Sequence, residues 1–246
     1  MKRWAGVIGS PIEHSLSPIL HDTAFGLLGL DWEYRKYRVE TDELATFIAG
    51  VGADCVGLSV TSPLKRAILP LVDATDGLAN LVEAANTVAF SSAMSAAFNT
   101  DVQAIVDTVR PHLVAPSVTG SSGLGLLVPE NAGPLTSLPP AVVVGTGATA
   151  CSALAALKSL GATKVYLVGR SFAGPQNAYV IGMALGLEVH SVLLRVVDRY
   201  LPALNAAPVL ISTVPPAATV DLASNLTPHR DGVLLDVTYS SGQTPL

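Results

Sequence analysis

The chain has 246 residues, of which 50% are hydrophobic and only 13% are charged. A formal net charge of −5 without clusters of Lys or Arg excludes a nucleic-acid surface, and the lack of an apolar run of about 18 residues excludes a membrane-spanning helix. We therefore expect a cytoplasmic protein of one large or two small domains that acts on small molecules, and the apolar composition leaves a homodimer open.

The first half alternates apolar runs rich in β-formers with segments of helical period. Strands are predicted at WAGVIG (4–9), WEYRKYRV (32–39) and CVGLSV (55–60), with helices in SPILHDTAFGLL and TDELATFIAG. Such alternation predicts βαβ units and a largely parallel sheet.

The amino-acid composition of the chain changes after Arg110. Residues 111–140 are rich in Gly, Ser and Pro and show no sustained period, which predicts a loop or a domain boundary. We therefore place one domain at 1–110 and a second at 111–236, with 237–246 able to pack back on the first.

The second half alternates more regularly. Strands are predicted at AVVVG (141–145), TKVYLVGR (163–170), LEVHSVLL (187–194), PVLISTV (208–214) and VLLDVTY (233–239), with helices at 149–160, near 175–186 and near 196–204. This layout is typical of a nucleotide-binding sheet. The predicted fold class is thus α/β with two domains, the second of Rossmann type.

A glycine turn joins the first strand and helix of this half, at Gly145, Thr146, Gly147 and Ala148. Glycine there allows a sharp turn and lets backbone N–H groups approach a pyrophosphate at the helix N-terminus. Ala150 stands at the third glycine position of the usual fingerprint, which the pattern allows. An ordinary βα turn is the alternative.

The type of cofactor is predicted from the tip of the next strand, at Gly169, Arg170 and Ser171. No acidic residue is present there to accept the ribose hydroxyls of NAD, whereas a guanidinium can bind a phosphate, so NADP is favoured. We add Thr213, in PVLISTV, to the cofactor-binding set. A solvated arginine at a strand end is the alternative.

Polar segments interrupt the apolar first half at EHSLSP (13–18), SVTSPLK (59–65), AANTV (84–88) and AFNTD (97–101). Each falls at or just beyond the carboxyl end of a predicted strand, where open α/β sheets bind ligands. Hydroxyl and amide groups suited to a polyhydroxylated substrate come from Ser15, Ser17, Thr61, Asn86 and Thr100.

Lys65 and Asp101 supply charge to these segments. If they face each other, the carboxylate orients the ammonium, which can then exchange a proton with a substrate oxygen as hydride moves to or from the attached carbon. Each residue also has a structural alternative: Ser17 as a helix cap, Asn86 as a turn residue, Lys65 as a solvated side chain. Together these alternatives explain the pattern less well than one shared site.

Six segments together resemble the shikimate dehydrogenase family over nearly the whole chain: GSPIEHSLSP, SVTSPLK, AANTV, FNTD, GTGATA and DVTYSSGQTPL. The resemblance implies an amino-terminal substrate-binding domain and a carboxy-terminal NADP domain. It also implies reversible reduction of 3-dehydroshikimate, a polyhydroxylated cyclic acid, to shikimate with NADPH, in the pathway of aromatic amino acid biosynthesis.

By the same resemblance, Lys65 and Asp101 would be the catalytic pair, the predicted hydroxyl and amide side chains would bind substrate, and Tyr239 would lie near substrate and nicotinamide. The chain departs from the family pattern with Ser59 in place of Asn, with Glu83 in place of a small residue, and in lacking a second basic residue near Arg170 in the sequence.

No metal site is predicted, because the five histidines are scattered and lack an acidic cluster. Two alternatives to the leading function stay open. The first is a related oxidoreductase acting on quinate or an aminated shikimate, and the second is a sensor that keeps the cofactor fold without turnover.

Overall fold

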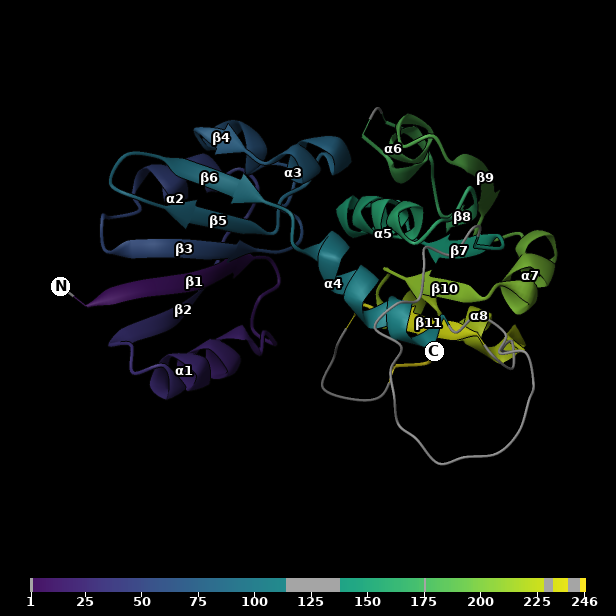
Figure 1. The fold of residues 1–246 in the computed structure, drawn as a ribbon, viewed down its shortest axis with the longest axis horizontal. Helices are drawn as coiled ribbons and strands as arrows, with labels where there is room; N and C mark the ends of the chain where they lie inside the picture. Colours follow the sequence, from purple (N-terminus) through teal and green to yellow (C-terminus); the bar gives the residue numbers. More distant parts are fainter. Residues whose placement is uncertain (1, 114–137, 175, 228–231, 239–243) are drawn as a thin grey trace, which may run out of the picture. The chain divides into compact units, whose positions relative to one another are not determined.

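The computed structural model describes residues 2–113, 138–174, 176–227, 232–238 and 244–246. These residues form two compact units, the first ending at Asp101 and the second beginning at Val102 (Figure 1). Helix α4 (Asp101–Val109) thus belongs, after its first residue, to the second unit, whereas the sequence places it in the first domain. Most of the predicted boundary segment 111–140 lies outside the described residues.

The first unit is built on a sheet whose described strands are β1 (Arg3–Gly9), β2 (Trp32–Arg38), β3 (Cys55–Val60), β4 (Ala74–Thr75), β5 (Thr87–Phe90) and β6 (Ser95–Phe98). Their order is β2-β1-β3-β5-β6-β4. The pairs β2-β1 and β1-β3 are parallel, but β5 runs antiparallel to both β3 and β6. Strand β4 is parallel to β6, so among the described strands β5 alone runs against the other five. The expected largely parallel sheet is therefore confirmed for this half, with the short strand β5 as its exception.

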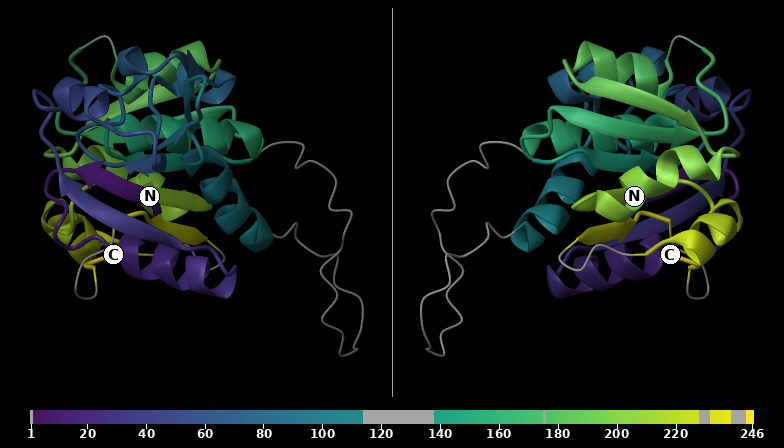
Figure 2. Two further views of the ribbon diagram at one scale, coloured as in Figure 1. Left: turned by 90° about the vertical axis from the view of Figure 1, so that its left-hand side faces the viewer. Right: turned by 90° about the vertical axis from the view of Figure 1, so that its right-hand side faces the viewer.

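In the described part of this unit, three helices accompany the sheet: α1 (Ser17–Leu27), α2 (Leu44–Ala49) and α3 (Gly77–Val82). Helix α1 lies along β2 at the edge of the sheet (Figure 2). Its inner face is aromatic and polar: Phe25 meets Trp32 edge to face at 5.5 Å, and His21 stacks on Tyr34 at 4.1 Å. Asp22 accepts a hydrogen bond of 2.8 Å from the Tyr34 N–H.

The outer face of α1 is apolar, which inverts the usual pattern of a surface helix. No residue of α1 is buried, and the large side chains in or beside it that stand exposed are Leu16, Ile19, Leu20, Leu27 and Leu28. At helical spacing, Leu16, Leu20 and Leu27 fall on one stripe. The sequence pattern identified the helix correctly, but it did not reveal which face is turned to the sheet.

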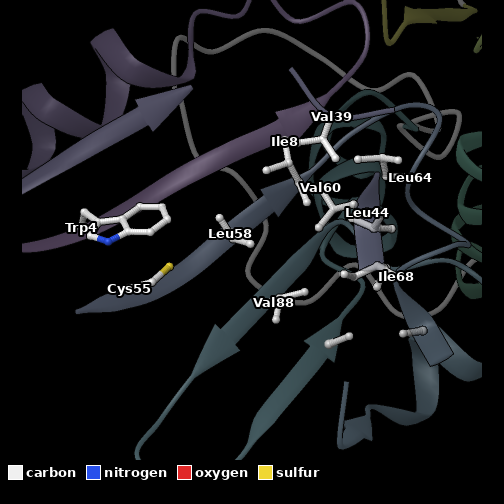
Figure 3. Packing of buried hydrophobic residues seen from close by; sticks show 13 residues of the cluster. Trp4, Ile8, Val39, Leu44, Cys55, Leu58, Val60, Leu64, Ile68 and Val88 are labelled. Carbon is white, nitrogen blue, oxygen red and sulfur yellow. The ribbon is translucent and has the colours of Figure 1, made fainter. Parts of the chain in front are cut away.

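The core of the first unit gathers around the carboxyl ends of β1 and β3. Figure 3 shows Ile8 and Val60 pointing into the same space as Leu44 of α2 and Leu64 of the turn after β3. All four side chains are 2% exposed or less. This packing holds the ends of the two strands together at the place where the polar segments begin.

The second unit is a parallel sheet of β7 (Ala141–Val144), β8 (Lys164–Gly169), β9 (Glu188–Leu193), β10 (Val209–Ser212) and β11 (Val233–Asp236). Among the described strands the order is β11-β10-β7-β8-β9, so the chain changes direction across the sheet between β7 and β10. This is the doubly wound order expected of a Rossmann-type sheet. Each predicted strand of this half is present within a few residues of its expected bounds.

The helices of the second unit besides α4 are α5 (Ala148–Ser159), α6 (Ala178–Ala184), α7 (Val197–Ala206) and α8 (Val220–Asn225). Tyr200 of α7 and Leu222 of α8 pack with Val142 and Val144 on one face of the sheet. Helix α5 contacts β7 and lies beside α6 (Figure 1), and its residues 150–157 are all buried. Leu246 packs against the α7 side of this unit.

Cys55 and Cys151 are both buried, and neither forms a disulfide bond. Burial raises the pKa of the Cys55 thiol to about 11, so the thiol stays protonated at neutral pH. Among the helices that the structure describes, none combines the length and apolarity that crossing a membrane requires.

Truncating Ile8 should destabilise the first unit. Ile8 is 0% exposed, so Ile8→Ala leaves a cavity and is expected to cost about 2–5 kcal/mol of unfolding free energy. Leu27 is 85% exposed, and Leu27→Ala should change it by less than about 0.5 kcal/mol. Both tryptophans, Trp4 and Trp32, lie in this unit, so urea unfolding followed by tryptophan fluorescence reports on it selectively. Equal losses of unfolding free energy in Ile8→Ala and Leu27→Ala would contradict the assigned core.

Candidate active site

The polar segments of the first unit share one rim because β5 is antiparallel. Ser59 pairs with Thr87, and Thr87 pairs with Phe98. The start of β5 therefore lies between the ends of β3 and β6. Asn86, just before β5, and Asp101, just after β6, reach the same edge of the sheet as the turn after β3. The sequence predicts all the polar segments at or just beyond the carboxyl ends of strands. Asn86 instead precedes the amino end of β5, and it reaches the same edge because β5 is antiparallel.

Backbone hydrogen bonds join these segments to one another. Thr61 N donates to Ile8 O at 3.0 Å, Ala85 N to Lys65 O at 2.8 Å, and Asn86 N to Phe98 O at 3.1 Å. Gly9, at the end of β1, lets the turn after β3 approach closely, since a Cβ there would lie 2.4 Å from Cγ2 of Thr61. The rim is thus fixed by main-chain contacts before any side chain is considered.

Lys65 and Asp101 meet at this rim. The Lys65 ammonium lies 2.5 Å from Oδ2 of Asp101, with side-chain exposures of 13% and 20%. The alternative of a solvated lysine is therefore wrong. A half-enclosed pair of this kind orients the ammonium while leaving part of it open to a ligand.

Asn86 holds the carboxylate in place. Its amide nitrogen donates to Oδ1 of Asp101 at 2.7 Å and to Oγ1 of Thr100 at 2.8 Å, and its carbonyl oxygen accepts from Thr100 N at 2.9 Å. Both oxygens of Asp101 are therefore engaged, one by Lys65 and one by Asn86. A role as a turn residue alone does not account for these contacts of Asn86 with Thr100 and Asp101.

The two predicted serines lie between β1 and α1. Ser15 is 8% exposed, and its hydroxyl accepts from Ser17 N at 3.3 Å. Ser17 is the first residue of α1 and makes no side-chain cap, so the capping alternative is wrong. Thr61 is half-buried at the end of β3. Tyr239 lies outside the described residues.

Sequence reasoning missed Tyr34. Its hydroxyl donates to Oγ of Ser59 at 2.6 Å, at the position where the chain carries Ser in place of the family's Asn. Tyr34 is 6% exposed and also stacks on His21, whose Nδ1 lies 2.9 Å from Ser17 O. A tyrosine in an edge strand gives no sequence signal of this contact, because the contact depends on strand order.

Glu83 stands out at the end of α3. It adopts a left-handed conformation with φ 49°, and its Oε2 is buried with no hydrogen-bond partner in the described part of the chain. A side chain in this conformation costs about 1 kcal/mol or more. The strain lies three residues before Asn86.

Glu83→Gly should stabilise the first unit by about 1 kcal/mol, because relief of the left-handed strain and loss of the unpaired oxygen outweigh the extra chain entropy of glycine. Glu83→Ala removes the carboxylate but keeps the strain, so it separates the two causes. Urea unfolding monitored by tryptophan fluorescence measures both. If Glu83→Gly is no more stable than Glu83→Ala, the left-handed backbone at residue 83 is not strained.

In the second unit, Gly145 and Thr213 meet where the strand order reverses. Gly145 has φ 120°, and a Cβ there would lie 2.1 Å from Oγ1 of Thr213. Thr213 bonds back to Val144 O through both its N–H and its hydroxyl, each at 2.9 Å. In open α/β sheets this reversal is where nucleotides bind.

The rest of the turn fits a dinucleotide. Gly147 precedes α5, and a Cβ built there would have no heavy atom within 4 Å, so space is left above the helix N-terminus. Ala148 begins α5, and Ala150 is fully buried. Thr146 lies over Gly169, where a Cβ would come within 2.4 Å of its methyl group. The open N-terminus of this 12-residue helix suits a pyrophosphate.

Arg170 and Ser171 follow β8. Ser171 accepts a hydrogen bond of 3.2 Å from Ala173 N, and Arg170 lines a cavity of about 480 Å³ in the second unit. A larger hollow of about 700 Å³ in the first unit is lined by Trp4, Tyr37 and Phe47 among others, and by none of the predicted substrate-binding residues. We therefore assign it no catalytic part.

Among the described residues, no three His, Cys, Asp or Glu side chains come close enough to hold a metal ion.

Comparisons with known proteins point one way. A family model described as the shikimate dehydrogenase substrate binding domain matches residues 7–88. The curated shikimate dehydrogenase (NADP(+)) of Citrifermentans bemidjiense is 40% identical over 168 residues, which are 68% of this chain and 51% of the relative. That of Geobacter sp. strain M21 is 40% identical over 185 residues, 74% of this chain and 57% of the relative.

A solved structure decides the family. The crystal structure of Mycobacterium tuberculosis shikimate dehydrogenase is 31% identical with a TM-score of 0.79, covering 99% of this chain and 82% of that one. The chain belongs to the shikimate dehydrogenase family. The resemblance and the two-part α/β fold with a Rossmann-type sheet are thereby confirmed. The matched region spans about half the length of the two curated shikimate dehydrogenases, at 51% and 57%.

Proposed function

We propose that the chain is an NADP-dependent oxidoreductase that reversibly reduces 3-dehydroshikimate to shikimate. The observation that carries the proposal is the Lys65–Asp101 pair at 2.5 Å on a rim of hydroxyl groups. The names of the two curated relatives, both NADP(+)-dependent shikimate dehydrogenases, support the same reaction. We propose further that the first unit binds substrate and the second binds NADP.

NADPH, when bound, would supply the hydride for the substrate carbonyl carbon. Lys65 donates a proton to the carbonyl oxygen in the same step, so that a hydroxyl forms, and takes that proton back when the reaction runs in reverse. Asp101 keeps the ammonium oriented between turnovers, and Asn86 holds Asp101 in place through its hydrogen bond to Oδ1.

Substrate hydroxyls and its carboxylate would be bound by Ser15, Ser17, Thr61, Asn86 and Thr100, with Tyr239 as a further proposed contact. Ser17 suits this role because its hydroxyl is not used as a helix cap. The cofactor would be bound by Gly145, Thr146, Gly147, Ala148, Arg170, Ser171 and Thr213. A homodimer and a cytoplasmic location complete the proposal.

Mixing the protein with 3-dehydroshikimate and NADPH, and following the loss of reduced-nicotinamide absorbance, tests the reaction. Turnover with NADPH well above that with NADH is expected. Assays in the reverse direction, with NADP⁺ and either quinate or an aminated shikimate analogue, follow the gain of reduced-nicotinamide absorbance and test the related substrates. Binding of 3-dehydroshikimate and NADPH without turnover would instead favour a sensor.

Lys65→Ala should lower kcat by about 10²–10⁴, the range for one positioned acid–base group. Lys2→Ala is the matched control, because Lys2 forms an exposed pair with Asp31 and its removal should leave kcat unchanged. Unchanged tryptophan fluorescence would show that both variants are folded. A Lys65→Ala variant with near-native kcat would rule out the assigned role.

Arg170→Ala should weaken NADPH binding by about tenfold to a hundredfold, the worth of a charge-assisted hydrogen bond, and NADH binding much less. Titration of each reduced cofactor, followed by its fluorescence, measures the two dissociation constants. Equal losses for the two cofactors would refute a contact with the phosphate.

A further inference from the structure

A second guanidinium lies beside the cavity that Arg170 lines. The cavity of about 480 Å³ is lined by Arg170, Leu193, Leu194, Arg195, Val197, Tyr200, Ala218, Asp221 and Leu222. Arg195 belongs to the turn between β9 and α7, twenty-five positions after Arg170, so no local motif connects the two. Sequence reasoning looked for a second basic residue only next to Arg170.

Strand pairing explains why the two arginines share a cavity. Gly169 is the register partner of Leu193, and Leu194 N donates to Gly169 O at 2.8 Å. The residues that follow these two parallel strands therefore leave the sheet at the same edge. The polypeptide brings Arg170 and Arg195 together through the β8-β9 ladder.

The turn that carries Arg195 is held firmly. Val196 N donates to Leu193 O at 2.9 Å, which closes the turn. The buried Tyr200, 1% exposed, donates from its hydroxyl to Leu194 O at 3.1 Å. The main chain on each side of Arg195 is thus fixed, and its side chain starts from a defined point on the cavity wall.

The charges at the cavity are not balanced within the protein. Among the described residues, neither Arg170 nor Arg195 forms an ion pair with a carboxylate. Asp221 is the one acidic residue among the lining residues, so the lining carries a net charge of 2 − 1 = +1. Two exposed guanidiniums without carboxylate partners at one cavity favour a ligand with a doubly charged anionic group.

We propose that Arg195 is the second residue that binds the 2′-phosphate of NADP(H) and so helps to set the preference over NAD(H). This inference rests on the proposed function. A phosphate monoester carries close to two negative charges at neutral pH, which matches two forked donors. With NADH the two guanidiniums would face a neutral ribose hydroxyl, and their positive charge would have no anionic partner. NADPH is preferred over NADH for this reason.

Arg195→Ala in the full chain is the test, with Arg199→Ala as its control. Arg199 is exposed on the next turn of chain, in α7, and does not line the cavity. We expect Arg195→Ala to weaken binding of NADPH and of 2′,5′-ADP about tenfold or more, and of NADH and 5′-AMP less than twofold. Raising the salt concentration should reduce the difference in NADPH affinity between the wild type and Arg195→Ala, because salt screens the charge interaction. Arg199→Ala should change none of these constants.

Equal losses for NADPH and NADH, or no loss for either, would overturn the assignment of Arg195 even if the wild-type chain reduces 3-dehydroshikimate. A selective loss of 2′,5′-ADP binding in a chain that lacks turnover would instead uphold the assignment and refute the proposed reaction. A loss equal to that of Arg199→Ala would mean a general effect of surface charge and would also overturn the assignment.

Discussion

The register between β3, β5 and β6 is the constraint on which the candidate catalytic rim depends. Because Ser59, Thr87 and Phe98 lie side by side across three strands, the chain before β5 and the chain after β6 emerge beside the turn after β3. A slip of one residue would turn Val88, which is 0% exposed, out of the core and would move Asn86 off the rim. The burial of Val88 thus secures the position of a polar residue two places away.

The two units share a close contact between a glycine and a threonine at the ends of adjacent strands. In each, a glycine stands at the end of the first strand or directly after it, and a threonine follows the neighbouring strand at the reversal of strand order. A Cβ on Gly9 would collide with Thr61, and a Cβ on Gly145 with Thr213, at 2.4 Å and 2.1 Å. Glycine here is needed because the adjacent threonine fills the space that a side chain would occupy. The result in both units is an open sheet edge with hydroxyl and N–H groups at the switch point.

Much of the second unit could be predicted, because its strands are continuous apolar runs and its turn carries a recognisable glycine pattern. Lys65 and Asp101 were also paired correctly from the polar segments that surround them. What could not be predicted depends on strand order: the antiparallel β5, the Tyr34–Ser59 contact and the convergence of Arg170 with Arg195. A single sequence gives each strand its period but not its neighbours, so contacts made across a sheet are found only once the order is known.

The inverted helix α1 has a consequence for the serines that precede it. Helix α1 has no buried residue, whereas the last four residues of β1 are all buried, so we expect α1 to open at a lower free energy than β1. Ser15 and Ser17 therefore sit at a junction between a rigid strand and a loosely held helix. A ligand that binds both hydroxyls must also order the first turn of α1, and part of its binding free energy is used for that ordering.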